Sequence, residues 1–204
     1  MDVRLFILPI LWMSLSGMSP CFHATEQIAT YLPSNRLSDK GLDPSKLQFT
    51  VDENPNSLEI HIYYENARVG RLLVFAHSPY GDQFAKVSDV QLGSEVQRKG
   101  LGQLLYLYAN DYTLQKWGKS LSSSSVSMMG NNSKALWKKL VETNFAWELD
   151  TGGWIMDPRN RHSPQSRDAR DFINTHLITP EEEQTILAGP KNKDVPQRIL
   201  GYNN

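Results

Sequence analysis

A short glycine-containing segment, QRKGLG at positions 97–102, joins a predicted strand to a predicted helix. The first amides of a helix have no intrahelical acceptor and carry about half a positive charge, so they attract anions. Gly100 and Gly102 lack the Cβ atoms that would hold an anion away from these amides. The segment could therefore hold a phosphate, or it could be a plain turn. It is neither a Walker loop nor a dinucleotide fingerprint, because the required Lys and third glycine are missing.

Few other residues have the spacing that metal or covalent chemistry requires. The five His residues show no metal-ligand spacing, and the only Cys, Cys21, lies near the N-terminus. We therefore expect no metal and no disulfide in the body of the chain. A net charge of −1 gives no reason to expect nucleic acid as a partner.

Four strand signals precede the glycine segment. Residues 46–51, 58–64, 69–78 and 84–93 alternate or run apolar, and short turn clusters separate them. Successive strands joined by short loops form antiparallel meanders. The glycine segment is thus expected directly after the last strand of a meander.

The apolar period then changes to that of a helix. A helix is predicted from Leu101 to Trp117, directly before Gly118, and a strand of small residues over 121–126. NNSKALWKKLVET predicts a second helix, capped by Asn131 or Asn132. FAWEL and WIMD then flank a turn and predict a hairpin. This order predicts an α+β fold with one mixed central sheet.

The N-terminal segment differs from the body. Residues 1–24 combine one Arg with an apolar run shorter than the roughly 20 residues that span a membrane. We expect a signal-peptide-like leader, cleaved near Ala24 or after the small residues around Gly17, and no stable membrane span. The alternative is a mis-assigned start or a buried hydrophobic strand.

The C-terminal segment, residues 159–204, is polar and Arg-rich at its start. It is expected to be a short helical extension, in which Thr179 and Glu182 form a capping box before a short helix.

Two motifs in this order resemble those of the GNAT N-acetyltransferases. QRKGLG matches the acyl-coenzyme A motif [Q/R]-x-x-G-x-[G/A] of that family. LSSSSV followed by NNSKALWKKLVETNFA looks like its next strand and its N-x-x-A-x-x-[L/W]-[Y/W] helix. The resemblance covers roughly residues 47–157. It implies an acyl-coenzyme A-binding domain over 25–158 that moves an acetyl group from acetyl-coenzyme A to an amine of a peptide, a protein or a small molecule.

The resemblance also implies a set of cofactor-binding residues. The coenzyme's diphosphate would lie on the amides of the glycine segment, where Arg98 and Lys99 could add charge or stay solvated. The pantetheine arm would lie between the strand before this segment and the strand after the helix, with a backbone amide near Leu92 polarising the thioester carbonyl. The implied residues are Leu92, Gln97, Arg98, Lys99, Gly100, Leu101, Gly102, Gln103, Asn131 and Asn132.

The proton donor departs from the family pattern. Many members place a Tyr on the second helix to protonate the leaving thiolate, whereas this chain has Trp137, whose indole N–H is no useful acid. Tyr106, Tyr108 and Ser124 are the candidate substitutes, and the two tyrosines are equally candidates for the core.

For a base, strand alternation is expected to place Val87, Asp89 and Gln91 on one face and Ser88, Val90 and Leu92 on the other. Asp89 is then the carboxylate nearest the expected thioester, with Glu95 closer to the diphosphate. The alternative for Asp89 is an ion-paired or solvated strand residue.

The acceptor site and the compartment stay open. DENPNS joins the first two strands directly, where family members usually insert two helices that wall the acceptor site. The wall would then come from residues before Lys46, or the site would be open. The leading hypothesis is an active transferase. The second is a GNAT-fold domain that binds an acyl-coenzyme or a protein without turnover, which would suit an exported effector. The third is an exported α+β protein without a coenzyme.

Overall fold

The computed structural model describes residues 33–192. The expected leader over residues 1–24 and Cys21 lie outside the described residues, as do residues 193–204 of the expected extension. The hypotheses on cleavage and compartment therefore stay predictions.

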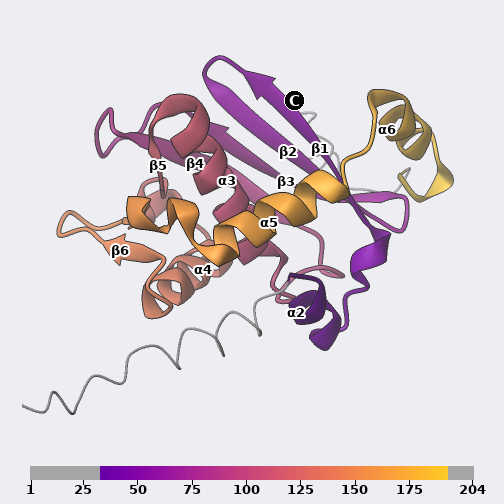
Figure 1. Ribbon diagram of the computed structural model, residues 1–204, viewed down its shortest axis with the longest axis horizontal. Coiled ribbons are helices and arrows are strands. Elements are labelled where there is room, and N and C mark those ends of the chain that lie inside the picture. The colour runs from indigo at the N-terminus through magenta and orange to yellow at the C-terminus, as the bar shows by residue number, and fades with distance from the viewer. Residues whose placement is uncertain (1–32, 193–204) are drawn as a thin grey trace, which may run out of the picture.

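A seven-stranded mixed sheet in the order β1-β2-β3-β4-β5-β7-β6 organises the fold (Figure 1). The strands are β1 (Leu47–Asn54), β2 (Ser57–Tyr64), β3 (Ala67–Phe75), β4 (Phe84–Leu92), β5 (Ser120–Ser122), β6 (Ala146–Glu148) and β7 (Trp154–Met156). Strands β4 and β5 are parallel, and all other neighbours are antiparallel. The predicted α+β class, the four-strand meander and the hairpin after the second helix are confirmed.

Five α-helices accompany the sheet within residues 33–192. They are α2 (Pro33–Asp39), α3 (Leu101–Trp117), α4 (Asn131–Glu142), α5 (Pro164–Thr175) and α6 (Pro180–Leu187). Short 3-10 turns are η1 (Pro44–Lys46), η2 (Val126–Met128), η3 (Pro158–His162) and η4 (Pro190–Asn192).

The helix ends agree with most of the capping residues predicted from the sequence. Helix α3 has the predicted bounds, and Gly118 ends it in the left-handed conformation at φ 66°. The capping box of α6 is present, with Thr179 and Glu182 each bonding the other's backbone. The predicted Asn cap of α4 is wrong, because Gly130 is the N-cap residue and no side chain caps the helix. Asn131 and Asn132 thus keep their side chains for other contacts.

The apolar core lies between the sheet and the layer of α3 and α5, which Figure 1 shows on one face. Leu104, Leu105 and Leu107 of α3 are buried in the same apolar cluster as strand residues such as Ile60 and Leu72. This layer fixes α3 directly over the central strands.

Helix α5 shares the same core. Ala169 and Ile173 are fully buried, and Phe172 packs edge-on to Phe49 of β1 at 6.3 Å between ring centroids. The chain after α5 then runs beside β1, where Phe49 N–H donates to His176 O at 3.0 Å. The first part of the expected extension is therefore built into the main domain.

Strand β4 contains two irregularities that shape the site. It pairs with β5 only over Phe84–Lys86, and the β3 register shifts so that Leu73 faces Asp89 while Val74 faces Val87. Ser88 is the extra residue of this β-bulge. The two strands of the parallel pair therefore separate beyond Lys86.

The opposite face of the sheet is polar and is partly covered by α6. Glu183 of α6 accepts hydrogen bonds from Thr50 Oγ1, at 3.1 Å, and from the Tyr63 hydroxyl. In the described part of the chain, no helix is long and apolar enough to cross a bilayer.

Candidate functional site

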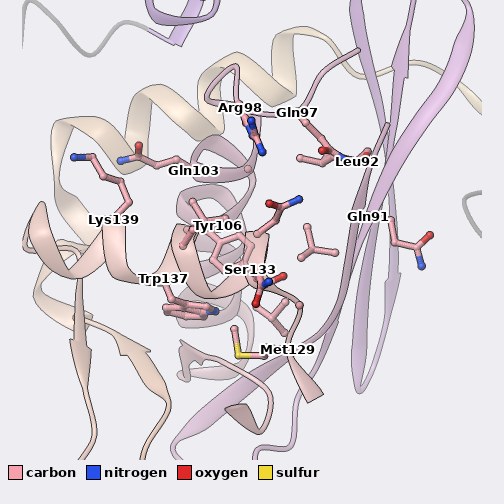
Figure 2. A pocket seen from close by; sticks show the side chains of 18 of the residues that line it. Gln91, Leu92, Gln97, Arg98, Gln103, Tyr106, Met129, Ser133, Trp137 and Lys139 are labelled. Atoms are coloured by element: carbon pink, nitrogen blue, oxygen red, sulfur yellow. Dashed lines mark hydrogen bonds between the residues drawn. The ribbon is translucent and has the colours of Figure 1, made fainter. Parts of the chain in front are cut away.

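A cleft of about 980 Å³ opens between β4 on one side and α3 and α4 on the other. Figure 2 shows Gln97 and Arg98 near one end of it and Trp137 and Met129 near the other. The first end is polar and the second is mostly apolar, so the cleft suits an elongated ligand with a polar head.

The separation of β4 from β5 creates this cleft. Gly93 N–H donates to Val69 O of β3 at 2.6 Å, so the backbone of Gly93 faces β3. Because N–H and C=O groups of a strand alternate in direction, the backbone of Leu92, and with it that of Val90, faces the cleft. This strand edge thus lines one wall without a strand partner among the described residues, close to the predicted thioester position, and of its groups the Leu92 carbonyl is bound by Gln97.

The glycine turn closes the polar end of the cleft. Arg98 and Gly100 take left-handed conformations at φ 60° and 92°, and Gly100 is the N-cap of α3 without a side-chain cap. Among the described residues, none accepts a hydrogen bond from the amides of Leu101, Gly102 or Gln103. These helix-initial amides are therefore available to an anion.

A hydrogen bond holds the turn in place, and the absence of a side chain at Gly102 leaves space between the walls of the cleft. Gln97 Nε2 donates to Leu92 O at 2.6 Å, which ties the turn to the end of β4. A Cβ atom built on Gly102 would lie 3.1 Å from Leu136 Cδ2 of α4 and 3.8 Å from Leu92 Cδ1. Both leucines line the cleft, so any larger side chain at position 102 would project between its two walls.

The structure brings most of the predicted cofactor-binding residues together. The ones that line the cleft are Leu92, Gln97, Arg98, Gly100, Gly102, Gln103, Asn131 and Asn132. Lys99 and Leu101 do not line it. Lys99 Nζ donates to Gly41 O at 3.1 Å, and the Leu101 side chain is fully buried in the core. Leu101 can therefore take part only through its backbone amide.

Asp89 lies at the cleft but is engaged on the opposite face of β4. Its Oδ2 atom accepts from Arg71 Nε (3.1 Å), Arg71 Nη2 (2.8 Å) and Gln91 Nε2 (2.6 Å). Figure 2 shows Gln91 pointing away from the cleft. The expected alternation is wrong at one place: Val87 belongs to the core face with Val90 and Leu92, because the bulge at Ser88 breaks the period. Asp89 thus has the ion-paired arrangement that the sequence left open.

Tyr106 and Trp137 meet at the less polar end of the cleft. Their rings lie edge to face at 5.1 Å between centroids, and Trp137 stacks on Trp154 at 6.5 Å. Both Tyr106 and Trp137 are fully buried, and burial raises the pKa of the Tyr106 hydroxyl. The buried Trp137 Nε1 makes no hydrogen bond of full geometry among the described residues, and the Tyr106 hydroxyl is close enough to interact with it, so this wall offers a donor.

The two other candidate acids differ in position. Ser124 lines the cleft, and its carbonyl oxygen accepts from the Tyr80 hydroxyl at 3.2 Å. Tyr108 lies in the core outside the lining, and burial raises its pKa to about 12. Tyr108 therefore has the core role, while Ser124 and Tyr106 stay with the cleft.

Several lining residues were not predicted from the sequence. They are Arg36 and Lys40 from the α2 region, Met128 and Met129 near η2, and Ser133 and Lys139 of α4. The spacing of Arg36 and Lys40, four residues apart in a short helical turn, is the one local signal that could have identified a shared basic face.

Within residues 33–192 no cluster of three or more His, Cys, Asp or Glu could hold a metal ion. The chain matches no protein-family model, and the comparison with curated proteins likewise gives no match.

Proposed function

We propose that the protein is an acyl-coenzyme A-dependent N-acyltransferase of the GNAT type, transferring an acetyl group to an amine. The observation that carries the proposal is the juxtaposition of a free β4 edge and the unbonded amides of the α3 start in one cleft. A thioester ligand with a diphosphate head and an amide-containing arm complements these two features.

Acetyl-coenzyme A would supply the acetyl group as a thioester, whose C–S bond breaks as the new C–N bond forms and whose sulfur leaves with the electron pair. The amides of Leu101, Gly102 and Gln103 would hold its diphosphate. The Leu92 amide would donate to the thioester carbonyl as negative charge develops there.

The two proton movements fall to residues of the cleft. Asp89 Oδ2 already has three donors on the opposite face of β4, so Oδ1 would accept the proton that the amine loses through a water at the strand edge. Tyr106 or Ser124 would deliver a proton to the thiolate. The raised pKa of Tyr106 makes it a weak acid, but it also keeps the hydroxyl protonated, so that a proton is present when the thiolate leaves.

The first prediction tests coenzyme binding. Acetyl-coenzyme A at 100 times its Kd should stabilise the protein by about 2.7 kcal/mol and raise Tm by about 5 to 10 °C. Gly102→Leu should abolish this shift, because its side chain would lie between Leu92 and Leu136. Differential scanning fluorimetry with and without the coenzyme measures both.

A matched control is available at the other end of α3. Gly118→Ala strains a left-handed residue that has nothing within 4 Å of its Cβ position, and should lower Tm while leaving the coenzyme shift intact. The absence of a shift in the wild-type protein at saturating acetyl-coenzyme A would rule out the proposed function.

A second function, coenzyme binding without turnover, is favoured by two observations. Trp137 stands where an acid is expected, and Asp89 is ion-paired with Arg71. Free thiol release across a panel of amines, followed with a chromogenic disulfide reagent, separates the two: binding without thiol release supports the second function.

A further inference from the structure

Helix α2 and the residue that follows it bring two basic side chains, Arg36 and Lys40, to the glycine turn. A Cβ atom built on Gly100 would lie 4.0 Å from Arg36 Cγ and 4.0 Å from Lys40 Cδ, so both side chains pass beside this backbone. Both residues line the cleft; Arg36 is half-buried and Lys40 is exposed. Two cations thus stand at the polar end, next to the amides that begin α3.

The position of these cations is set by packing. Leu37 is buried in the core, and Lys99 Nζ of the turn donates to Gly41 O just after α2, at 3.1 Å. Residues four apart share a face of a helical turn, so Arg36 and Lys40 point to the same side while Leu37 points inward. The pair is therefore held against the turn by the fold itself.

The cleft has a charge that the whole chain lacks. Among the described residues, the charged ones that line it are Arg36, Lys40, Arg98, Lys139 and Asp89, of which only Asp89 is acidic, in a chain of net charge −1. The carboxylate is bound to Arg71 on the other face of β4. A second carboxylate, Glu95, lies beside Gly93 at the start of the turn and does not line the cleft. The amides that begin α3 already match a diphosphate, so the two basic side chains beside Gly100 are placed for a further phosphate group.

We propose that Arg36 and Lys40 bind a phosphate monoester on the nucleotide end of the coenzyme, the 3′-phosphate of its ribose; this rests on the proposed function. A monoester carries between one and two negative charges at neutral pH and offers three oxygen acceptors, which a guanidinium and an ammonium match. The α2 segment then selects the 3′-phosphorylated coenzyme over its dephosphorylated form.

The test compares two ligands and two charge-neutral variants by isothermal titration calorimetry. The wild-type protein should bind coenzyme A about 10-fold or more tightly than 3′-dephospho-coenzyme A. The double variant Arg36→Gln, Lys40→Gln should lose this preference, binding both ligands within about twofold, at the affinity that the wild type has for the dephosphorylated ligand. Single variants should give intermediate preferences.

The matched control is the double variant Lys134→Gln, Lys138→Gln, which removes the same charge from α4 at positions outside the cleft lining. It should keep the wild-type preference. Equal wild-type affinity for the two ligands, or a parallel loss for both in the Arg36/Lys40 variant, overturns the inference while coenzyme binding stands. If neither ligand binds to the wild type, the proposed function fails with it. A far-ultraviolet circular dichroism melt confirms that each variant is folded.

Discussion

At the residue scale, the contribution of Trp137 to packing can be measured separately from the catalytic role expected at its position. The indole fills space between Tyr106 and Trp154, and its buried Nε1 makes no hydrogen bond of full geometry to a described residue, with the Tyr106 hydroxyl as its polar neighbour. Its contribution to stability is therefore packing rather than hydrogen bonding. Replacing it with a smaller aromatic ring should cost the packing energy alone, about 1 to 3 kcal/mol.

Trp137→Tyr should accordingly increase turnover if the chain lacks an efficient acid. The tyrosine hydroxyl would enter the cleft and could protonate the leaving thiolate, a role worth about 100-fold or more in rate. We expect free thiol release with acetyl-coenzyme A and a reactive amine to rise at least about 10-fold over wild type. Trp137→Phe is the control, since it makes the same cavity without the hydroxyl. Equal rates for the Tyr and Phe variants would show that Tyr106, Ser124 or water already protonates the leaving thiolate.

At the element scale, α5 determines whether the chain after Pro158 belongs to the folding unit. Phe172 is 9% exposed, packs edge-on to Phe49 and stacks on His176 at 4.3 Å. Phe172→Ala should reduce the free energy of unfolding by about 3 to 4 kcal/mol within one cooperative transition. Urea denaturation followed by tryptophan fluorescence measures it. Thr175→Ala, at an exposed position of the same helix, should change it by less than about 0.5 kcal/mol. A small effect of Phe172→Ala, or a separate early transition, would make α5 an appendage.

The elements that local sequence determines were predictable. The α3 helix begins after Gly100 and ends before Gly118 because both glycines adopt left-handed conformations that other residues avoid. The α6 capping box is also a local interaction between residues three apart. Most of the cleft lining around the glycine turn follows from the same local signals.

The features that the sequence missed depend on tertiary contacts. The bulge at Ser88 arises from the pairing of β4 with β3, so simple alternation placed Val87 on the wrong face. The approach of α2 to Gly100 joins segments about 60 positions apart in the sequence, and no local pattern encodes it. The early end of β5 at Ser122 similarly follows from its switch of partner to β7.

At the scale of the whole molecule, the sheet separates an apolar face from a charged one. The charged face holds buried His61, Arg68 and Arg71, which are 8%, 6% and 7% exposed. Arg71 is paired with the Asp89 carboxylate at 2.8 Å, whereas His61 lies 3.2 Å from Asp52 and contacts the Arg68 guanidinium. Removing one partner of such a buried pair leaves an uncompensated charge, so the stability of the fold should depend on pH through this face.

His61 is the group on this face whose ordinary pKa of 6.5 is lowered in the folded protein. Its Nδ1 atom accepts from the Arg68 guanidinium, and Nε2 can donate to Asp52, an assignment that follows from the two partners. Burial, together with the positive charge of Arg68, lowers the pKa of His61 from 6.5 to about 4. The negative charge of Glu183 opposes this shift, but burial and the contact with Arg68 outweigh it, since a protonated ring would direct an N–H at a guanidinium.

The lowered pKa fixes the direction of the pH effect. Below pH 6.5 His61 is protonated in the unfolded chain, whereas in the folded protein it becomes protonated only near pH 4. The stabilisation from neutral His61 is therefore complete above pH 6.5 and is lost progressively down to pH 4. Allowing for partial solvent screening, wild type should lose about 1 to 3 kcal/mol more than His61→Gln across this range, since Gln keeps a donor and an acceptor but does not titrate. Urea unfolding of both proteins at several pH values between 4 and 7.5 measures this difference. The contribution of the carboxylates to the pH dependence is common to both proteins and cancels in the subtraction. Parallel pH profiles would mean that the pKa of His61 is not lowered in the folded protein and that neighbouring carboxylates outweigh burial and Arg68.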